Sequence, residues 1–446
     1  MALFKYIVLS VCLCGIHLNG FAQSTREAIL EDIARTGGVY YAYPVKEAIA
    51  TPPPKGYKPF YISHYARHGS RWIQSEQDYK TVVDIFEKAH QAGALTALGE
   101  DVRKRMALVW EDAEGHGGDL TPLGVRQHRG IAERMFQNYP EVFKGSPALS
   151  ARSTVVLRCV LSMDAFCERL KELNPALQIR REACARYMKY MNYHTPEAVK
   201  FVSHQGPWYE EYRKFKESHT RPDRLVTSLF NSPDYIRKNV NPGELMWGLY
   251  WIASDLQNVE IEVSLYDVFQ EDELFDLWQV CNYHNYVCDG PAPANGGIMT
   301  ASARSLLENI LDSADEAIRS GTHAATLRFG HDGNIIPLVA LLQLGDMWKA
   351  ETYICSRVRP CTAIRSAPFA SHCRATATPV SCSASQPMRI LTVRGLSGPR
   401  APRAAATMRP HSSGFCISLL PAPLDVILGA GQPMLMSRIS NCTPFS

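Results

Sequence analysis

The sequence predicts an α/β fold, with a large domain built on a mainly parallel sheet flanked by helices and a smaller, inserted α-helical cap domain. Two apolar runs, 59–66 and 324–330, have the length and composition of buried strands, and a helical pattern follows each. Between them, residues 156–310 are mostly helical in pattern. The chain of 446 residues is 46% hydrophobic and 20% charged, which is sufficient to bury a sizeable core.

Caps and periodicity predict the helices of the large domain. Thr121-Pro122 has the pattern of a helix start, with Thr as the N-cap and Pro at the first helical position. Further helices are expected near 78–92, at 301–319 and at 335–344, whereas 282–297 is rich in Pro and Gly and is expected to form a loop.

These patterns divide the chain into five parts. The large domain comes in two pieces, separated by the cap, and an atypical tail follows it. The expected order is a signal peptide at 1–22, the first part of the large domain at 23–155, the helical cap at 156–310, the second part of the large domain at 311–351, and the tail at 352–446.

The first residues have the pattern of a secretory signal peptide. Lys5 supplies a positive start, an apolar stretch covers 6–16, and small residues precede a cleavage site after Ala22. The alternative is a buried N-terminal strand or helix. The signal-peptide interpretation predicts a periplasmic or secreted protein in an oxidising compartment. Cys281 and Cys288 are close enough in sequence for a local disulfide, although spacing alone does not establish one.

Charge and motif content exclude several classes of protein. The net charge is +3, without the strong basic bias of a nucleic-acid-binding protein. After the N-terminus no apolar run is long enough to span a bilayer, so stable membrane insertion is not expected. No CxxC or HExxH pattern is present, so neither a zinc site nor another cofactor is expected. The oligomeric state is not readable from the sequence.

Each of the two predicted strands leads directly into a histidine. The first runs into Arg67-His68-Gly69-Ser70-Arg71, and the second ends at His331-Asp332. Ligands of open α/β sheets bind beyond the carboxyl ends of the strands. This placement predicts a site that contains both histidines.

The segment 67–71 suits a phosphate group. Arginine forks bind phosphate oxygens through paired, charge-assisted hydrogen bonds, and a neutral imidazole can attack phosphorus to form a phosphohistidine. A glycine between them lets the backbone turn. The alternative is a basic surface turn that contains a hydrogen-bonded histidine. We therefore predict a small-molecule phosphate ester as the partner of this site.

These residues resemble motifs of the histidine phosphatase superfamily. Residues 67–71 resemble its RHGxR signature, and His331-Asp332 resembles the HD motif of its acid phosphatase branch, which includes phytases. Multiple inositol polyphosphate phosphatases also belong there, but usually carry His-Ala-Glu at the second motif. Leu120-Thr121-Pro122-Leu123-Gly124 resembles the family's LTxxG helix start. The resemblance covers about residues 24–350, with a departure at Ile73, where many members have Pro.

The resemblance implies a role for each matched residue. His68 would be the nucleophile, and Asp332 would give its proton to the leaving alcohol and then help to activate water. The groups that hold the phosphoryl oxygens would be Arg67, Arg71, Arg152 and His331. His331, beside an anionic phosphate, is expected to be held as the cation. A protonated carboxyl favours an acidic working pH, and no metal is required.

Two assignments have open alternatives. Arg152 is placed by the weaker segment 150–154, and Arg158 competes for its role as the third phosphate-binding arginine. His331-Asp332 taken alone could be a helix N-cap with a neighbouring histidine. A further group of basic residues could meet extra phosphates of a ligand such as phytate or could form a solvated helix face: Arg180, Arg181, Arg186 and Lys189.

The tail differs in composition from the rest of the chain. From Thr352 onward there are ten arginines, no lysine and a single acidic residue, Asp425, which gives +9 there and −6 for residues 1–351. We interpret this as a shifted reading frame near residues 350–355. A genuine basic tail or a secreted Cys-rich module is the alternative.

The predicted function is a secreted or periplasmic phosphomonoesterase that works through phosphohistidine, a histidine acid phosphatase in the terms of the resemblance. Two specificities are considered for this enzyme. One is for phytate or another inositol polyphosphate, and the other is that of a general acid phosphatase or sugar-phosphatase. A non-catalytic phosphoester-binding product with an aberrant C-terminus is the second class. A mutase, which would transfer the phosphate to a second alcohol, is the third.

Overall fold

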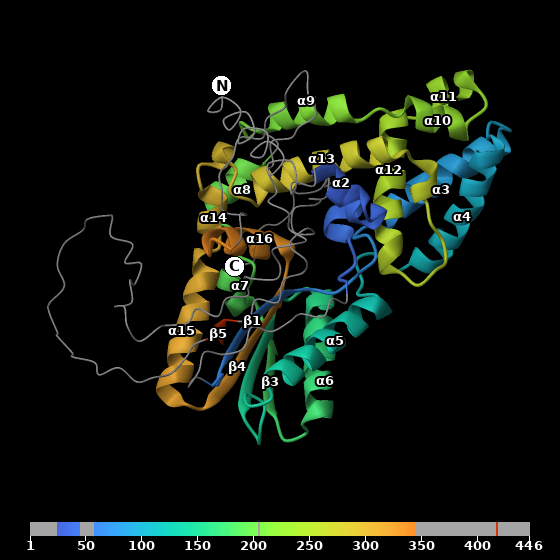
Figure 1. Ribbon diagram of the computed structural model, residues 1–446. Helices are drawn as coiled ribbons and strands as arrows, with labels where there is room; N and C mark the ends of the chain where they lie inside the picture. Colours follow the sequence, from blue (N-terminus) through green and yellow to red (C-terminus); the bar gives the residue numbers. More distant parts are fainter. Residues whose placement is uncertain (1–24, 45–57, 204–205, 345–415, 418–446) are drawn as a thin grey trace, which may run out of the picture.

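A computed structural model describes residues 25–44, 58–203, 206–344 and 416–417. The described chain forms a parallel sheet with helices on both faces and a large helical unit beyond one end of the strands (Figure 1). The predicted α/β class is confirmed. The predicted signal peptide and almost all of the atypical tail lie outside the described residues.

The sheet is parallel throughout, with the strand order β3-β2-β4-β1-β5. The two central neighbours, β1 and β4, pair in register from Ile62 opposite Ala325 to Arg67 opposite Gly330. Both strands therefore end at the same level, and the residues that follow them leave the sheet together. The strands are β1 Ile62–Arg67, β2 Ala148–Ser153, β3 Gln178–Ala183, β4 His323–Gly330 and β5 Cys416–Ile417.

Helices cover the two faces of the sheet with separate apolar clusters. On one face, α5 (Pro122–Asn138) and α6 (Leu157–Leu173) pack on the strands through side chains such as Phe166 and Phe329. On the other face, Tyr65 packs against a second group of helices. That group comprises α7 Met188–Met191, α15 Arg304–Ser320 and α16 Asp332–Leu341.

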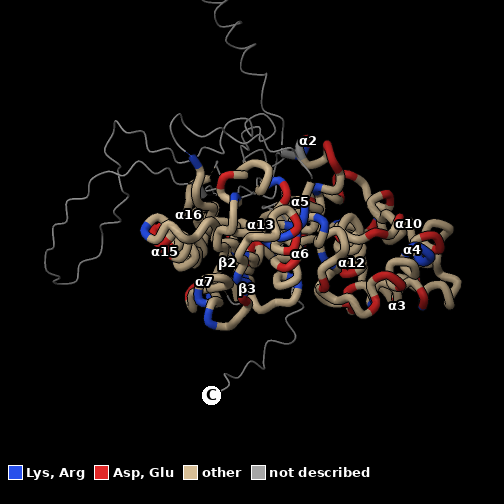
Figure 2. The backbone as a smooth tube through the Cα atoms, turned by 90° about the horizontal axis from the view of Figure 1, so that it is seen from below, with Lys and Arg blue, Asp and Glu red and all other residues tan. Residues whose placement is uncertain are grey.

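The helical unit has its own core, which is rich in aromatic side chains. Its centre is α12 (Pro242–Asp255), an almost uniformly apolar helix that buries Trp247, Tyr250 and Trp251. Acidic and basic residues both occur along its outer helices α3 and α4 (Figure 2), as on a solvated surface. The remaining helices of this unit are α2 Thr25–Leu30, η1 Ile33–Tyr40, α3 Glu76–Gln91, α4 Ala97–Ala113, α8 Pro196–Val202, α9 Tyr209–His219, α10 Asp223–Leu229, α11 Pro233–Asn239 and α13 Glu271–Cys288.

Short segments connect these parts. A five-residue helix, α14 (Ile298–Ser302), precedes α15 and contributes Met299 to the core of the helical unit. The 3-10 turns are η2 Ala185–Tyr187, η3 Leu256–Asn258, η4 Tyr266–Val268 and η5 Pro293–Asn295.

The first part of the predicted cap, 156–183, lies in the sheet layer. It contains α6 and β3, and β3 pairs along its whole length with β2. Conversely, α3 and α4 lie before residue 156 but contribute Phe86 and Met106 to the core of the helical unit. The helical unit is therefore assembled from two separate stretches of the chain.

The structure corrects two local expectations. β3 (QIRREA) was expected to be helical, but its side chains are exposed or half-buried and carry no apolar periodicity. The expected loop at 282–297 begins seven residues later, because α13 continues through Cys288 with Asn282, Asn285 and Val287 buried. Elsewhere the expected helix starts agree closely, and the Thr121 hydroxyl accepts the Gly124 N–H as an N-cap.

A close backbone contact joins α5 to the turn that follows β1. A Cβ atom added at Gly124 would lie 2.4 Å from the Ser70 carbonyl oxygen, and one added at Gly69 would lie 2.5 Å from the Gly124 carbonyl oxygen. Neither contact leaves space for a side chain. The glycine of the predicted LTxxG segment is therefore required by packing against the 67–71 turn.

We expect Gly124→Ala to lower the free energy of unfolding by about 1–3 kcal/mol, because the backbone must shift to admit the methyl group. Gly130→Ala is the matched control on the same helix, since its Cβ would approach only the flexible end of Arg134. Removing a mid-helix glycine should leave stability unchanged or raise it by up to about 1 kcal/mol. Chemical denaturation measures both, and equal losses in the two variants would contradict this account.

Candidate active site

The in-register pairing of β1 and β4 brings the two predicted histidines together. His68 and His331 each follow the last residue of a strand, and the His68 N–H donates to the Gly330 carbonyl at 2.9 Å. Their ring centroids are 5.7 Å apart, at an interplanar angle of 68°. The site lies beyond the carboxyl ends of the strands, as expected for an open parallel sheet.

The imidazole of His68 is held in one tautomer. Nδ1 lies 2.8 Å from the carbonyl oxygen of Gly69, and a carbonyl can only accept, so Nδ1 carries the proton. Nε2 is then the nitrogen with the lone pair, and no described residue hydrogen-bonds to it. Burial and the charges of Arg67, Arg71 and Arg158 lower the pKa of His68 well below its usual value. The ring is therefore neutral and nucleophilic down to acidic pH.

His331 is oriented by neutral groups. Its ring Nε2 lies 3.2 Å from the Thr154 hydroxyl and 3.7 Å from the Cys159 sulfur, and the backbone N–H of His331 donates to the Tyr65 hydroxyl at 3.3 Å. Burial, together with the arginines of the site, lowers the pKa of His331 to about 4, although Asp332 opposes this. The expected imidazolium therefore depends on the negative charge of a bound anion.

Three arginines surround His68. Arg67 donates to the Val39 carbonyl at 2.5 Å, and Arg71 donates to the Trp72 carbonyl at 2.8 Å and lies over the ring of Tyr40. The Nε atoms of Arg67, Arg71 and Arg158 are buried and have no hydrogen-bond partner in the described part of the chain. Buried guanidinium donors without acceptors are costly, and an anion between them would satisfy them.

Arg158, rather than Arg152, is the third arginine at this site. Arg158 lies in the first turn of α6. Its charge lowers the pKa values of both His68 and His331, and the charges of Arg71 and Arg67, after burial, lower its own. The sequence analysis gave Arg158 only as the alternative to Arg152 for this role.

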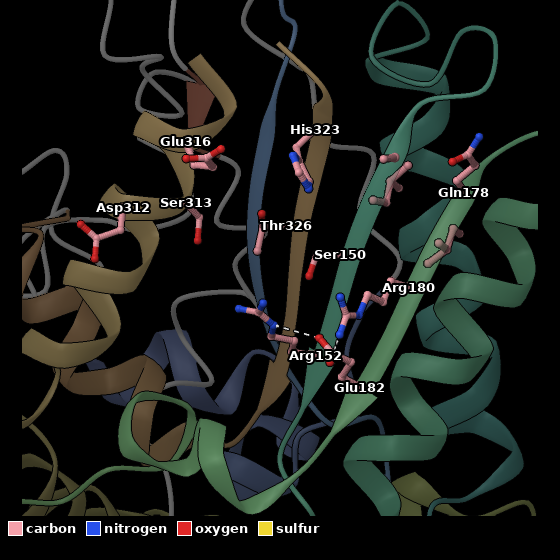
Figure 3. A pocket seen from close by; sticks show the side chains of 13 residues that line it. Ser150, Arg152, Gln178, Arg180, Glu182, Asp312, Ser313, Glu316, His323 and Thr326 are labelled. Carbon is pink, nitrogen blue, oxygen red and sulfur yellow. Dashed lines mark hydrogen bonds and ion pairs between the residues drawn. The ribbon is translucent and has the colours of Figure 1, made fainter. Parts of the chain in front are cut away.

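Arg152 is directed to the other face of the sheet. Its guanidinium donates to the Tyr190 hydroxyl at 3.0 Å, stacks on Tyr187 at 4.4 Å and lies 3.6 Å from Glu182. It lines a separate pocket of about 660 Å³ between β3 and α15 (Figure 3). Side chains alternate along β2, so Leu149 and Ala151 pack under α6 while Arg152 faces away from it. The structure does not bring Arg152 to His68.

Asp332 lies at the start of α16 beside the arginines. Its carboxylate is 3.6 Å from Arg67 Nε, and Oδ1 accepts the N–H of Gly333 at 3.1 Å. Burial raises the pKa of Asp332, but the charges of Arg67, His331 and Arg71 outweigh burial and hold it below the usual value. The carboxyl is thus ionised over most of the acidic range unless a nearby negative charge restores its proton.

A hydrogen-bond network fixes the turn between β1 and α3. Ser70 donates its N–H to Gln127 and its hydroxyl to Asn258, at 2.9 and 2.7 Å. Asn258 in turn donates to the Tyr40 carbonyl at 2.7 Å, and the Gly69 N–H donates to Ser162 at 3.0 Å. The turn is therefore held by α5, α6 and the helical unit together.

The three arginines considered for extra phosphates have partners away from His68. Arg180 pairs with Glu182 at 2.8 Å on edge strand β3, and Arg181 pairs with Asp164 on α6. Arg186 lies 5.8 Å from the ring of Tyr187. These contacts favour the interpretation of an ion-paired, solvated surface.

The described residues contain no disulfide and no metal-binding cluster. Cys281 and Cys288 are both on α13, and the five cysteines of the described residues are free. Within the described ranges no cluster of three or more His, Cys, Asp or Glu side chains could hold a metal ion, and no helix there is long and apolar enough to cross a membrane.

Comparison with known proteins agrees with this fold and with the predicted family. The chain matches the histidine phosphatase superfamily (branch 2) over residues 65–373, a range that ends inside the atypical tail. No curated protein sequence matches it. The Bifidobacterium longum multiple inositol polyphosphate phosphatase in complex with inositol hexasulfate has a similar structure, with a TM-score of 0.61 and 17% identity over 71% of this chain and 83% of that one.

Two further solved structures resemble this chain. The phosphate complex of the same Bifidobacterium longum enzyme has a TM-score of 0.60 and 18% identity, over 71% of this chain and 81% of that one. The phytase from D. castellii has a TM-score of 0.49 and 16% identity, over 70% and 69% of the two chains.

A histidine among arginines at the carboxyl edge of a parallel sheet is an arrangement suited to phosphoryl transfer. The family match covers most of the chain, so the protein belongs to branch 2 of the histidine phosphatase superfamily. Membership makes it a phosphatase, an enzyme that hydrolyses phosphate esters.

Replacing Arg158 and replacing Arg152 should affect phosphate binding to different extents. Arg158→Gln should weaken binding of inorganic phosphate roughly 10- to 150-fold, the loss expected for one hydrogen bond to a charged group. Arg152→Gln should change it less than about threefold, because Arg152 is held by Tyr190 and Tyr187 on the other face. Isothermal titration calorimetry measures both constants. A larger loss in the Arg152 variant would overturn the assignment.

Proposed function

We propose that the protein is a periplasmic or secreted phosphomonoesterase in which His68 is the nucleophile and Asp332 the general acid. The observation that carries this proposal is the neutral imidazole of His68, with Nδ1–H bound to the Gly69 carbonyl and a pKa lowered by burial and by the charges of Arg67, Arg71 and Arg158. Arg67, Arg71, Arg158 and His331 are the groups proposed to hold the phosphoryl oxygens.

In the first step the Nε2 lone pair of His68 attacks phosphorus as the bond to the leaving oxygen breaks. The arginines neutralise charge on the three equatorial oxygens, and they are already in place before the substrate binds. The hydrogen bond from Nδ1 to Gly69 stays intact and stabilises the positive charge that develops on the ring. Asp332 gives its proton to the leaving oxygen.

In the second step water replaces the histidine. Asp332, now a carboxylate, accepts a proton from the attacking water, and the bond from phosphorus to Nε2 breaks. Inorganic phosphate leaves, and both side chains return to their starting protonation states. Hydrolysis distinguishes this cycle from a mutase, in which a second alcohol would take the phosphate.

Phytate is the first candidate substrate. A fold-level neighbour binds inositol hexasulfate, an analogue of a fully phosphorylated inositol. Arg180 and Arg181 are ion-paired on or beside β3, and Arg186 lies near Tyr187, so these three arginines have partners away from His68. A general acid phosphatase or sugar-phosphatase activity is the alternative. The ratio of the rate of phosphate release from phytate to the rate from a simple aryl phosphate distinguishes the two.

Export and the tail are separate parts of the proposal. Export rests on the signal-peptide pattern at 1–22. For residues 352–446 we propose a shifted reading frame, which resequencing of the 3′ end tests directly. If no alternative frame restores acidic, lysine-containing sequence, this part is wrong. A true shift favours the alternative of an inactive phosphoester-binding product, because the large domain would then lack its last elements.

The direct test is phosphate release between about pH 4 and 7, without added metal, from phytate and from an aryl phosphate. We expect release by the wild-type protein and its loss in His68→Ala. Because the pKa of His68 is lowered, kcat/KM should not fall between pH 6.5 and about 5 through protonation of the nucleophile. Folded protein that releases no phosphate from either substrate, or an unaffected His68→Ala variant, would refute the proposal.

Asp332→Asn should separate substrates by their leaving groups. Loss of the general acid should lower kcat by roughly 10²- to 10⁴-fold for an alkyl phosphate, whose alkoxide needs a proton. The loss should be much smaller for p-nitrophenyl phosphate, because its leaving group is stable as an anion. Equal losses on the two substrates would show that Asp332 does not act as the acid.

A further inference from the structure

A second carboxyl lies beside the general acid and comes from the helical unit. Asp289 is the C-cap of α13, and its Oδ1 lies 3.5 Å from the position that a Cβ would take at Gly333. Gly333 is also the residue whose N–H binds Oδ1 of Asp332. The two carboxyl groups thus flank the same backbone segment, at the N-terminus of α16.

Asp289 is held in place by the backbone around it. Its N–H donates to the Asn285 carbonyl at 2.8 Å. The buried amide of Asn295 donates to the carbonyls of Val287 and Gly290, at 3.0 and 2.8 Å, and so ties the chain on both sides of Asp289. The position of this carboxyl relative to α16 is therefore built into the fold.

Few charges lie near Asp289. The described residues provide no ion pair for it, and burial lowers the pKa of His194, whose ring lies 3.9 Å from the same Gly333 position, which disfavours a positive charge there. Cys288 adjoins it on α13, and the pKa of that thiol is raised by burial and then by Asp289 itself. The charged group that faces Asp289 is Asp332, and Asp332 in turn faces Arg67.

The two carboxyls differ in how readily they ionise. Burial, with the charge of Asp332 as the second cause, raises the pKa of Asp289 to about 7, whereas the arginines hold the pKa of Asp332 below its usual value. Two interacting carboxyls lose their protons in two steps that belong to the pair. Between those steps the pair keeps one proton, even where Asp332 alone would have lost its own.

We propose that Asp289 and Asp332 form a coupled pair that shares one proton, and that Asp289 is the positioning residue that keeps the general acid supplied with it. The inference rests on the proposed function. A bound phosphate adds negative charge next to Asp332 and so favours the arrangement with the proton on Asp332 and the charge on Asp289. After Asp332 protonates the leaving oxygen, the attacking water returns the proton to the pair, so protons balance over one turnover.

The direction in which Asp289→Asn should move the pH profile of kcat follows from this coupling. At the alkaline side of the profile, kcat falls when the pair loses its last proton. A negative Asp289 makes that loss harder, because like charges disfavour double ionisation. Asp289→Asn removes this charge, so Asp332 should lose its proton at a lower pH.

The test is the pH profile of kcat for an alkyl phosphate. In Asp289→Asn the alkaline limb should move to lower pH by about one unit, with little change in KM, and Asp289→Glu should restore it at least in part. Asp315→Asn on the exposed surface of α15 is the matched control and should leave the limb in place. An unmoved limb in folded Asp289→Asn would overturn the pair, even though wild-type activity and its loss in His68→Ala would still uphold the phosphatase.

A binding measurement tests the pair without turnover. Inorganic phosphate is titrated into the full chain at about pH 6 in two buffers of different ionisation enthalpy, which gives the protons exchanged with solvent. With the pair intact, the proton that Asp332 needs comes from Asp289, and net uptake is small. Asp289→Asn should take up more protons from solvent. Equal uptake in the two proteins would contradict the proposal.

Discussion

The site depends on one constraint, the parallel and in-register pairing of β1 with β4. Because Arg67 lies opposite Gly330, the chain leaves both strands at the same level, and two histidines distant in sequence become neighbours. A shift of one residue would turn alternate side chains to the opposite face and separate the histidines. The glycine contact between the following turn and α5 then fixes the backbone that carries the arginines.

The charges around His68 and Asp332 determine which protonation state, and therefore which chemical role, each side chain can have. Burial among arginines keeps His68 neutral, which a nucleophile requires, but the same arginines draw the proton from Asp332. The same cationic cluster therefore favours His68 as the nucleophile and opposes Asp332 as the general acid. A bound phosphate, and in our proposal the carboxyl of Asp289, provide the negative charge that restores the balance.

The sequence predicted the parts of the molecule that have strong local signals. Apolar runs identified β1 and β4, the Thr121-Pro122 start identified α5, and motif resemblance identified the histidine pair. β3 was missed because an exposed edge strand carries no apolar pattern. Arg152 was chosen over Arg158 on motif resemblance, which does not show that the Arg152 side chain on β2 faces away from α6, the helix that carries Arg158. Asp289 has no local signal, since only the tertiary fold places it near Gly333.

The central claim is that His68 carries the phosphoryl group. Rapid quenching of the enzyme with a phosphate ester under alkaline conditions preserves phosphohistidine, and peptide mass spectrometry locates it. The account predicts phosphate on the peptide that contains His68, bound to Nε2, and none in His68→Ala. Steady phosphate release with no modified peptide, or with the phosphate on another residue, would contradict it.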